Sequence, residues 1–398
     1  MITVTSKKDC CGCTACAGVC PLGCITMQAD SEGFVYPVID ASKCINCGKC
    51  DKICPVQNRE PETTPRKTAY IMRNNDADIV RNSTSGGATS AFCEAVVAKG
   101  GIVFGAVYDE AFRVKHCGID NAAELTLFRG SKYVQSDTTG IFAQVKEQLE
   151  SGRLTMFIGT PCQVAGLKRY LGRDYNNLLT VDFVCHAVPS PLVWDLYRKT
   201  MEKKFGAPIT SVNFREKSFG YHSSTITLTF ANGKKSQENT LTDLMMKSFF
   251  DSISTRPSCH ECAFRRADRV SDLTVFDCWN ITRYVPSVKD DDKGYTAVLV
   301  HSDKGEELLK SVADKTVSYS ADFDLLLQYC GVMALKNPPI HPQRDAFFEA
   351  LNNGTGLEQA VKTYIPVKLS RKVFGKTKRT LHRLGILKLM KRIKAGGK

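Results

Sequence analysis

The sequence predicts two unlike parts, a small cysteine-rich α+β domain at the N-terminus and then an α/β domain with a mixed, largely parallel sheet. Two observations lead to this fold class. Ten of the 18 cysteines lie within the first 54 residues, whereas apolar strand-like segments alternate with helical ones after residue 68. At 398 residues, the chain is long enough for two or three domains.

Composition excludes several classes of protein. Hydrophobic residues make up 43% of the chain, which argues against global disorder. No apolar run reaches the ~18 residues of a membrane-spanning helix, and the N-terminus lacks the apolar stretch of a secretory signal. We therefore expect a cytoplasmic protein, in which so many cysteines bind metal rather than form disulfides.

The net charge of +13 is concentrated at the C-terminus. Residues 362–398 hold 13 Lys and Arg and no Asp or Glu, so the rest of the chain has 41 basic and 41 acidic residues. This balance excludes a basic body that binds nucleic acid.

Two four-cysteine runs share the spacing C-x2-C-x2-C-x3-C, and a proline follows each. The runs are Cys10, Cys13, Cys16 and Cys20, and Cys44, Cys47, Cys50 and Cys54. This spacing is typical of bacterial two-cluster ferredoxins, in which the fourth cysteine of each run binds the cluster of the other run. It predicts one 4Fe-4S cluster on Cys10, Cys13, Cys16 and Cys54 and a second on Cys44, Cys47, Cys50 and Cys20. Two zinc sites are the alternative, but zinc modules usually separate two C-x2-C pairs by a longer loop.

The predicted ferredoxin domain covers residues 1–58. Cys11 and Cys24 lie beside the ligands but outside their register, so we expect both to be small buried side chains. Residues 33–39 alternate enough to form a short strand between the two runs. The polar residues 57–68 contain two prolines and predict a linker.

The second domain, residues 66–350, is predicted from alternating strand and helix patterns. Strands are expected at 69–73, 101–108, 154–159, 178–184, 273–276 and 296–301, and helices at 88–99, 163–171 and 191–205. Residues 225–230, followed by Asn232-Gly233 and a polar run, predict a hairpin.

Four cysteines of this domain are candidates for a further metal site. Cys162 and Cys185 each follow an apolar strand, and the carboxyl ends of strands line the ligand crevice in open α/β sheets. Cys162 also lies at a helix N-terminus, which favours a thiolate. Cys259 and Cys262 form a C-x2-C pair, so the four could make a third four-thiolate site. The alternatives are buried core thiols at Cys162 or Cys185 and a redox pair or zinc half-site at Cys259 and Cys262.

The remaining cysteines show no mutual spacing and are expected to be structural. They are Cys93, Cys117, Cys278 and Cys330. His186 is either a catalytic acid, a ligand or a hydrogen-bonded packing residue.

Two loops have the composition of phosphate-binding segments. Residues 83–89, Ser-Thr-Ser-Gly-Gly-Ala-Thr, open a helix whose backbone amides could hold a pyrophosphate. An ordinary capped helix start is the alternative. Residues 130–136, Gly-Ser-Lys-Tyr-Val-Gln-Ser, combine a cation, a ring and hydroxyls suited to a phosphate and a flat ring system. An exposed loop is the alternative there.

Several motifs, in their order along residues 66–350, resemble those of the coenzyme F420 (deazaflavin) hydrogenase/dehydrogenase β subunits, which form one family. They are Ser85-Gly86-Gly87, Gly130-Ser131-Lys132-Tyr133-Val134-Gln135, Gly159-Thr160-Pro161-Cys162-Gln163, Asp182-Phe183-Val184-Cys185-His186 and Cys259-x2-Cys262. One departure is Cys278, which stands between Asp277 and Trp279 where the family tends to have a small residue.

The resemblance implies an iron–sulfur flavoprotein that passes electrons between clusters and FAD in an α/β flavin-binding domain. The residues it places around FAD are Ser85, Gly86, Gly87, Thr89, Lys132, Tyr133, Gly159, Thr160, Pro161 and Gln163. It makes Cys162, Cys185, Cys259 and Cys262 the ligands of a third 4Fe-4S cluster. The implied function is an oxidoreductase that exchanges electrons with a redox partner protein or a diffusible carrier. A non-catalytic electron-transfer subunit of a larger hydrogenase or dehydrogenase, and a zinc-stabilised scaffold, are the alternatives.

The basic tail has an apolar repeat. Leu381, Leu384, Leu387, Met390 and Ile393 recur every three residues among Lys and Arg. A basic amphipathic helix of this kind is typical of contact with an anionic membrane surface, here the inner face of the membrane. A docking helix for a partner protein and a solvated chain end are the alternatives.

Overall fold

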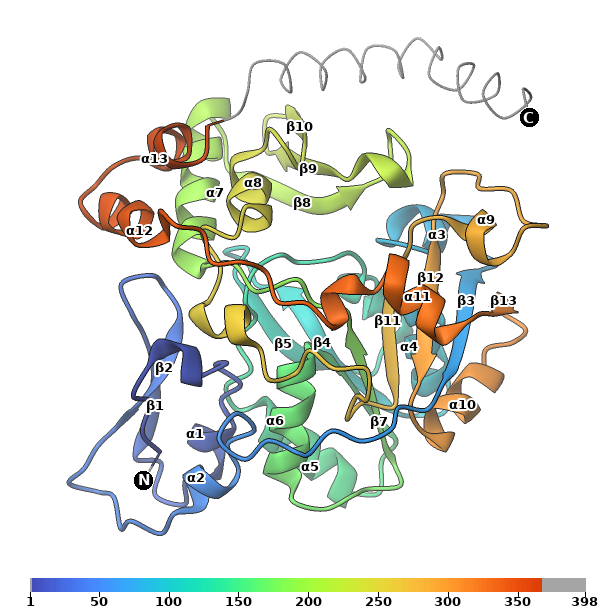
Figure 1. Cartoon of the computed structure of the whole chain (residues 1–398), viewed down its shortest axis with the longest axis horizontal. Coiled ribbons are helices and arrows are strands. Elements are labelled where there is room, and N and C mark those ends of the chain that lie inside the picture. Colours follow the sequence, from blue (N-terminus) through green and yellow to red (C-terminus); the bar gives the residue numbers. More distant parts are fainter. Residues whose placement is uncertain (1, 367–398) are drawn as a thin grey trace. The chain divides into compact units, whose positions relative to one another are not determined.

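The computed structural model describes residues 2–366 (Figure 1). They form two compact units, the first made of residues 2–192 and 255–340 and the second of residues 193–254 and 341–366. No helix within residues 2–366 is long and apolar enough to cross a lipid bilayer. The amphipathic helix predicted in the basic tail lies outside the described residues.

The N-terminal segment of the first unit holds one small sheet and two short helices. Its elements are η1 (Lys7–Asp9), α1 (Ala15–Val19), β1 (Ile25–Ala29), β2 (Val35–Ile39) and α2 (Lys49–Lys52). β2 is the strand predicted at 33–39, and it pairs antiparallel with β1, which was not predicted. Each helix lies within a cysteine run and follows a left-handed residue, Thr14 at φ 66° or Gly48 at φ 71°. These turns fold each run back on itself.

The centre of the first unit is an eight-stranded sheet in the order β13-β3-β12-β11-β7-β6-β4-β5. Its strands are β3 (Thr68–Asn74), β4 (Ile102–Tyr108), β5 (Val114–Ile119), β6 (Thr155–Gly159), β7 (Leu178–Phe183), β11 (Leu273–Cys278), β12 (Tyr295–Val300) and β13 (Thr316–Ser320). The four adjacent strands β11, β7, β6 and β4 pair in parallel, and the other pairs are antiparallel. Because β3 points the same way as these four, the predicted mixed, largely parallel sheet is confirmed.

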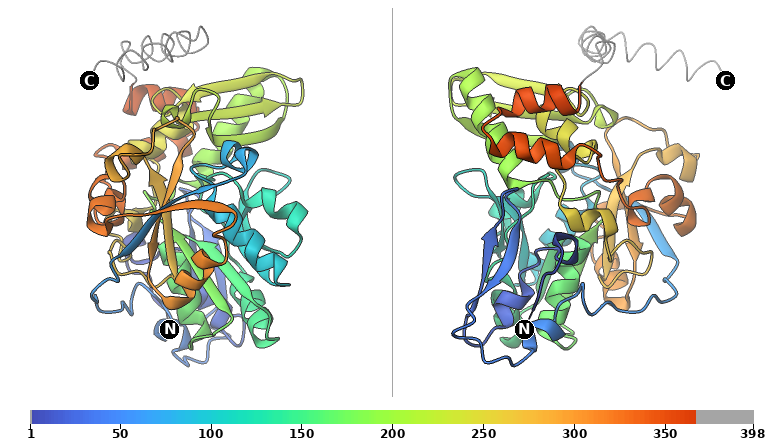
Figure 2. Two further views of the ribbon diagram at one scale, coloured as in Figure 1. Left: turned by 90° about the vertical axis from the view of Figure 1, so that its right-hand side faces the viewer. Right: turned by 60° about the vertical axis from the view of Figure 1, so that its left-hand side comes forward.

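Helices cover both faces of this sheet (Figure 2). They are α3 (Ala77–Asn82), α4 (Ala88–Ala98), η2 (Ala122–Phe128), α5 (Ile141–Glu150), α6 (Pro161–Leu171), η4 (Pro257–Glu261), α9 (Ile281–Tyr284), α10 (Asp303–Lys310), α11 (Phe323–Tyr329) and η5 (Val332–Ala334). Val103 and Met156 belong to the core under α4 and α10, whereas their neighbours Phe104 and Phe157 belong to the core under α5 and α6. A sheet buried on both faces explains why its strands are nearly continuous apolar runs.

The N-terminal segment is part of the first unit because α1 packs against α6. The predicted linker at 57–68 is also bound to the sheet domain. Arg266 donates hydrogen bonds to the carbonyls of Glu60 (2.8 Å) and Pro61 (2.7 Å). Asp268 accepts from the backbone of Thr63 at 2.6 Å. The ferredoxin segment is therefore held at a defined place on the sheet domain.

The second unit is a smaller α+β structure. Its elements are most of α7 (Pro191–Phe205), β8 (Ile209–Glu216), η3 (Tyr221–Ser223), β9 (Thr225–Phe230), β10 (Lys235–Asn239), α8 (Leu244–Phe250), α12 (Arg344–Asn352) and α13 (Leu357–Tyr364). β9 and β10 form the predicted hairpin, and α7 matches the predicted helix at 191–205. Tyr197 donates a hydrogen bond to the buried Asp243 at 2.6 Å, and Asp243 caps α8.

Candidate redox site

The structure places Cys16 and Cys54 close to Cys10. Burial raises the pKa of Cys16 to about 12, and the nearby Cys10 and Cys54 add to this rise. Burial also raises the pKa of Cys54, to which Cys10 again contributes. The last cysteine of the second run therefore lies close to cysteines of the first run, and Cys50 of the other predicted set also lies near Cys16.

Cys24 lies among the cysteines of the other predicted set. Its Sγ is 3.2 Å from Cys20 Sγ, and this contact raises the pKa of Cys24 to about 11, with Cys44 also contributing. Cys24 is 5% exposed, so it is a small buried side chain as expected. Its contact with Cys20 links the first run to Cys44 of the second.

The first run sits directly on α6. A Cβ at Gly166 would lie 2.9 Å from Cys13 Sγ, so only glycine allows the cysteine to approach the helix this closely. Thr138 Oγ1 donates to the carbonyl of Cys13 (3.2 Å), and Thr14 Oγ1 donates to the carbonyl of Thr138 (3.2 Å). These contacts fix the cysteine loop against the sheet domain.

Cys11 joins the ferredoxin thiols to the core thiols. Its side chain lies near those of Cys13 and Cys162, and the interaction with Cys13 together with burial raises its pKa well above the usual range. The pKa of Cys162 is also raised, first by the interaction with Cys11 and then by burial. We expected Cys11 to be a packing residue, and its position outside the register gave no sign of this contact.

The structure also gathers the four predicted core cysteines. Cys162 lies in the first turn of α6, Cys185 follows β7, and η4 carries Cys259 just before Cys262. Burial raises the pKa of Cys185, and Cys259, Cys162 and Cys262 raise it further. Burial likewise raises the pKa of Cys259 to about 12, with contributions from Cys262 and Cys162. The four thiols therefore lie close enough to influence one another's pKa, and their role as ligands stays a prediction.

Three arginine side chains lie near these thiols. Arg256, Arg265 and Arg269 lie close enough to counteract the rise in the thiol pKa values caused by burial. Within residues 2–366, no three His, Cys, Asp or Glu side chains converge closely enough to hold one metal ion. Zinc needs four ligands around a single ion, whereas each thiolate of a cubane binds a different iron. The arginines place positive charge near the four thiols, which favours their thiolate forms.

Hydrogen bonds join the segments predicted to surround FAD. Ser131 N donates to Thr84 Oγ1 at 2.9 Å, which connects the loop at 83–89 to the loop at 130–136. Gly86 N donates to Thr296 Oγ1 (3.0 Å), and a Cβ at Gly86 would lie 2.5 Å from the carbonyl oxygen of Met72. The glycine therefore allows this loop to press against the sheet.

Lys132 has the surroundings of a phosphate-binding residue. Its ammonium group donates to the carbonyls of Phe128, Arg129 and Gly130 at 3.4–3.5 Å. Burial lowers its pKa to about 8, and no carboxylate lies within ion-pair distance of it in the described chain. A half-buried cation without a carboxylate fits a phosphate group next to the two loops.

A chain of hydrogen bonds connects the third predicted flavin segment to β5. Gln163 Oε1 accepts from Thr160 N (2.9 Å), which caps α6, and Gln163 Nε2 donates to Ser136 Oγ (2.9 Å). Ser136 Oγ and the carbonyl of Ile158 each lie 2.9 Å from a ring nitrogen of His116. The side chain of Gln163 thus positions the start of α6 and with it Cys162.

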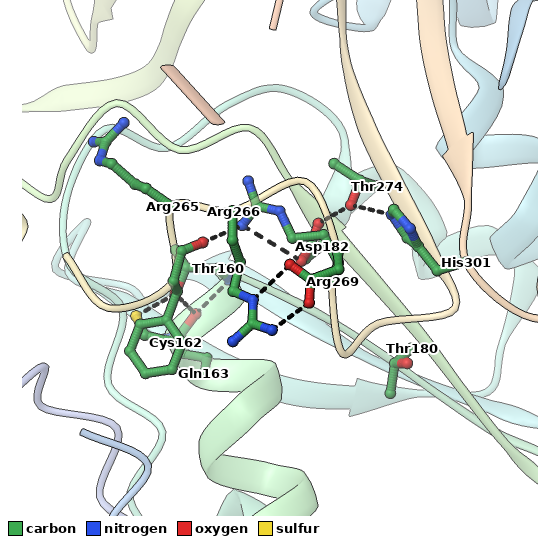
Figure 3. Close-up of polar contacts among 12 residues, drawn as sticks. Thr160, Cys162, Gln163, Thr180, Asp182, Arg265, Arg266, Arg269, Thr274 and His301 are labelled. Atoms are coloured by element: carbon green, nitrogen blue, oxygen red, sulfur yellow. Dashed lines mark hydrogen bonds and ion pairs between the residues drawn. The ribbon is translucent and has the colours of Figure 1, made fainter. Parts of the chain in front are cut away.

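A polar group is centred on Asp182 of β7 and Thr274 of β11, which pair in the sheet (Figure 3). Asp182 is fully buried, and burial raises its pKa. It accepts from Thr274 Oγ1 at 2.5 Å, and Thr274 Oγ1 lies 2.9 Å from His301 Nε2. Arg269 is 4.0 Å away, and burial lowers the pKa of His301 to about 3. Sequence analysis noted Asp182 only within a motif and missed its partners.

Asp182 also lines a cavity of about 520 Å³ within the first unit. The cavity is bounded by residues 52–60 of the ferredoxin segment, by α6 and by the loop at 263–270. Of the residues predicted to bind FAD, only Pro161 lines it. The flavin segments and this cavity are therefore different places on the sheet domain.

Cys278 lies apart from the core thiols. It is 2% exposed and forms a hydrogen bond with Cys330, which raises the pKa of Cys278. Tyr284 OH lies 3.1 Å from Cys330 Sγ. These residues belong to the apolar core under α11, which agrees with the structural role expected for both cysteines. His186 Nδ1 lies 3.2 Å from Met333 Sδ.

Comparison with known proteins identifies both parts of the chain. Residues 9–58 match the 4Fe-4S dicluster domain, and residues 152–324 match the family described as the C terminus of the coenzyme F420 hydrogenase/dehydrogenase beta subunit. The chain is 25% identical over 198 residues to the F subunit of the F(420)H(2) dehydrogenase of Methanosarcina mazei, covering 46% of this chain and 54% of that protein. It is 45% identical over 56 residues to the I 2 subunit of the NADH-quinone oxidoreductase of Geobacter metallireducens, covering 13% and 43%.

Two further matches cover different shares of the chain. A 7Fe ferredoxin of Hydrogenibacillus schlegelii is 36% identical over 64 residues, covering 16% of this chain and 76% of the ferredoxin. A chain of the F420-reducing NiFe hydrogenase complex from Methanosarcina barkeri has a TM-score of 0.43 and 15% identity, covering 79% of this chain and 97% of that one. This chain spans about half the length of the first two curated relatives.

The cysteine runs, the sheet domain and the two matching domains define an iron–sulfur protein related to oxidoreductase subunits. More narrowly, residues 152–324 match the C-terminal part of the coenzyme F420 hydrogenase/dehydrogenase β subunits, and residues 9–58 match a 4Fe-4S dicluster domain. The resemblance inferred from the sequence motifs is thereby confirmed.

Proposed function

We propose that this chain is an iron–sulfur flavoprotein oxidoreductase, in which the N-terminal clusters exchange electrons with FAD bound to the sheet domain. The observation that carries the proposal is the close approach of the first cysteine run to α6, the helix that carries Cys162, where a Cβ at Gly166 would lie 2.9 Å from Cys13 Sγ. This contact joins the ferredoxin cysteines to the core cysteines inside one compact unit. A relay needs its centres to be close, and the packing of α1 on α6 brings them close.

Each proposed group has a set of residues that would hold it. Cys10, Cys13, Cys16 and Cys54 would hold one cluster, Cys20, Cys44, Cys47 and Cys50 the second, and Cys162, Cys185, Cys259 and Cys262 a third. Lys132 and the backbone of the loop at 83–89 would bind the flavin phosphates. When bound, the clusters carry one electron at a time and the flavin accumulates two.

The residues of the chain would position the thiols, pack around them and place positive charge near them. The capping box of Thr160 and Gln163 sets the start of α6 and so the place of Cys162. The packing of Cys13 on Gly166 leaves no room for water between that cysteine and the helix. Arg256, Arg265 and Arg269 place positive charge around the core thiols, which favours thiolates.

Anaerobic purification with iron, zinc and flavin analysis tests this proposal. We expect one flavin and about twelve iron atoms per chain if all three clusters are present, or about eight from the N-terminal clusters alone. Cys162→Ser should lose about four iron atoms, whereas Cys93→Ser, a buried cysteine outside the thiol sets, should lose none. A colourless protein that contains zinc would refute the proposal. Equal iron in both variants would remove the third cluster from it.

A non-catalytic electron-transfer subunit is the second candidate function. It is favoured by the relatives, two of which are named as subunits of a dehydrogenase and of an oxidoreductase. Such a subunit would pass electrons to a redox partner protein. Flavin content separates the two functions: a stable, reducible FAD supports the oxidoreductase, and iron without flavin supports the electron-transfer role.

A further inference from the structure

Arg256 is a fully buried arginine at the contact between the ferredoxin segment and the sheet domain. Its guanidinium donates to the carbonyl oxygens of Cys10 (2.8 Å) and Val35 (2.9 Å). It also donates to Gln135 Oε1 at 2.9 Å and contacts Cys10 Sγ at 3.6 Å. The ring of Tyr36 lies 4.5 Å from its Cζ. Every one of these partners is neutral unless the cysteine is a thiolate.

Arg256 differs from the other arginines at this contact because it has no carboxylate partner. Arg169 is 2.6 Å from Glu60, and Arg266 pairs with Asp268. Within residues 2–366, no Asp or Glu oxygen lies within 4.0 Å of Arg256. A buried charge is costly unless an opposite charge compensates it.

The groups near Arg256 that can become anions are cysteines and Tyr36, whose pKa burial raises, so that it stays neutral. The charge of Arg256 acts on Cys162 and Cys259 as well as on the adjacent Cys10. A cysteine bound to iron is deprotonated, so a bound cluster would supply the missing negative charge. The buried cation therefore gains a counter-charge when a cluster is bound to Cys10.

We propose that Arg256 is the counter-ion of the cluster held by Cys10 and makes that cluster easier to reduce than the second N-terminal cluster. This inference rests on the proposed function, because it requires the clusters. Reduction adds one negative charge, and a nearby cation stabilises that charge most where water is excluded. The second set lies in a different environment, since Cys47 is exposed to solvent, which screens charge. Electrons would thus move from the exposed cluster inward to the buried one, next to Cys162.

The chain offers variants that change the charge in two independent ways. Arg256→Gln removes the cation, and Arg256→Lys retains it on a different side chain. Gln135→Glu leaves Arg256 in place but puts a carboxylate oxygen where Oε1 now lies, 2.9 Å from the guanidinium. Arg169→Gln is the matched control, because that arginine also binds the ferredoxin segment but is already paired with Glu60.

The measurement is an anaerobic redox titration followed by EPR, with iron analysis of each sample. We expect Arg256→Gln and Gln135→Glu to shift one titration step to a more negative potential and leave the other N-terminal step in place. Arg256→Lys should retain most of the wild-type potential, and Arg169→Gln should match the wild type. If Arg256→Gln does not fold, Gln135→Glu decides the test. Unchanged steps in Gln135→Glu with full iron, or equal shifts of both steps, would overturn the inference. Wild-type protein without iron would instead refute the proposed function.

Discussion

His116 makes the stability of the first unit depend on pH in a way that can be calculated. Its ring is buried, and burial lowers its pKa from 6.5 to about 4. In the neutral ring, Nε2–H donates to the carbonyl of Ile158 while Nδ1 accepts from Ser136 Oγ–H. Ser136 Oγ in turn accepts from Gln163. Protonation of Nδ1 would break this chain of hydrogen bonds.

The sign of the effect follows from which state binds the proton. In the unfolded chain His116 is protonated below about pH 6.5, whereas in the folded chain it is protonated only below about pH 4. The free energy of unfolding is therefore highest above pH 6.5 and falls as the pH drops through this window. The full loss is about 3 kcal/mol, of which about 1.3 kcal/mol falls between pH 7.5 and 5.5.

The assay is urea unfolding at these two pH values, followed by far-UV circular dichroism. His116→Gln should lose about 1.3 kcal/mol less than the wild type between pH 7.5 and 5.5. Ser136→Ala is the control, because it removes one hydrogen bond but keeps the buried ring. It should be less stable at both pH values, with the same difference between them as the wild type. If His116→Gln retains the wild-type difference, another group causes it.

Three further predictions concern packing, the second unit and the flavin. Gly166→Ala places a Cβ 2.9 Å from Cys13 Sγ and should cost about four iron atoms, whereas Gly172→Ala strains a left-handed residue without a close neighbour and should keep its iron; equal iron content would contradict this. Burial raises the pKa of Asp243 from 3.8 to about 6, so the second unit should lose about 3 kcal/mol as the pH rises through this range. In Asp243→Asn, the urea midpoints measured at pH 4.5 and pH 7 should differ less than they do in the wild type. Lys132→Gln should lower the flavin-to-protein ratio several-fold without loss of iron, and an unchanged ratio would place FAD elsewhere.

Local patterns predicted most of the sheet, because a buried strand is a run of consecutive apolar residues that can be recognised in the sequence. The strands β7 and β12 are continuous apolar runs, and both were found from the sequence. The strands β5 and β13 were missed, since they lie at the two edges of the sheet and carry polar residues on their exposed positions. β1 was missed for the same reason, because only Ile25 is buried in it.

The residues of the candidate site also fall into those that could be predicted from local sequence and those that could not. The two cysteine runs and the core cysteines follow from spacing and from strand ends, which are local features. Arg256 and Cys10 are 246 positions apart, and no periodicity connects residues at that separation. The partners of Cys11 were equally hidden, because its neighbour Cys162 lies on a helix of the other domain. Contacts between residues far apart in the sequence could be identified only from the three-dimensional structure.

The thiol of Cys11 could be either a neighbour of the clusters or a ligand. It stands outside the spacing that ferredoxin ligands follow, and its pKa is raised well above the usual range, so the thiol holds its proton. We therefore expect Cys11→Ala to retain the iron content of the wild type. The lost interactions with Cys13 and Cys162 should lower stability by about 1 kcal/mol.

Iron analysis and urea unfolding of Cys11→Ala, made beside Cys162→Ala, separate these roles. Cys162→Ala should lose about four iron atoms, because it removes a proposed ligand, whereas Cys11→Ala removes only the contact between the two thiol sets. A loss of about four iron atoms in Cys11→Ala would show that it binds a cluster itself. The ferredoxin segment and the sheet domain would then share a cluster, and electrons would cross between them through a common ligand rather than through adjacent thiols.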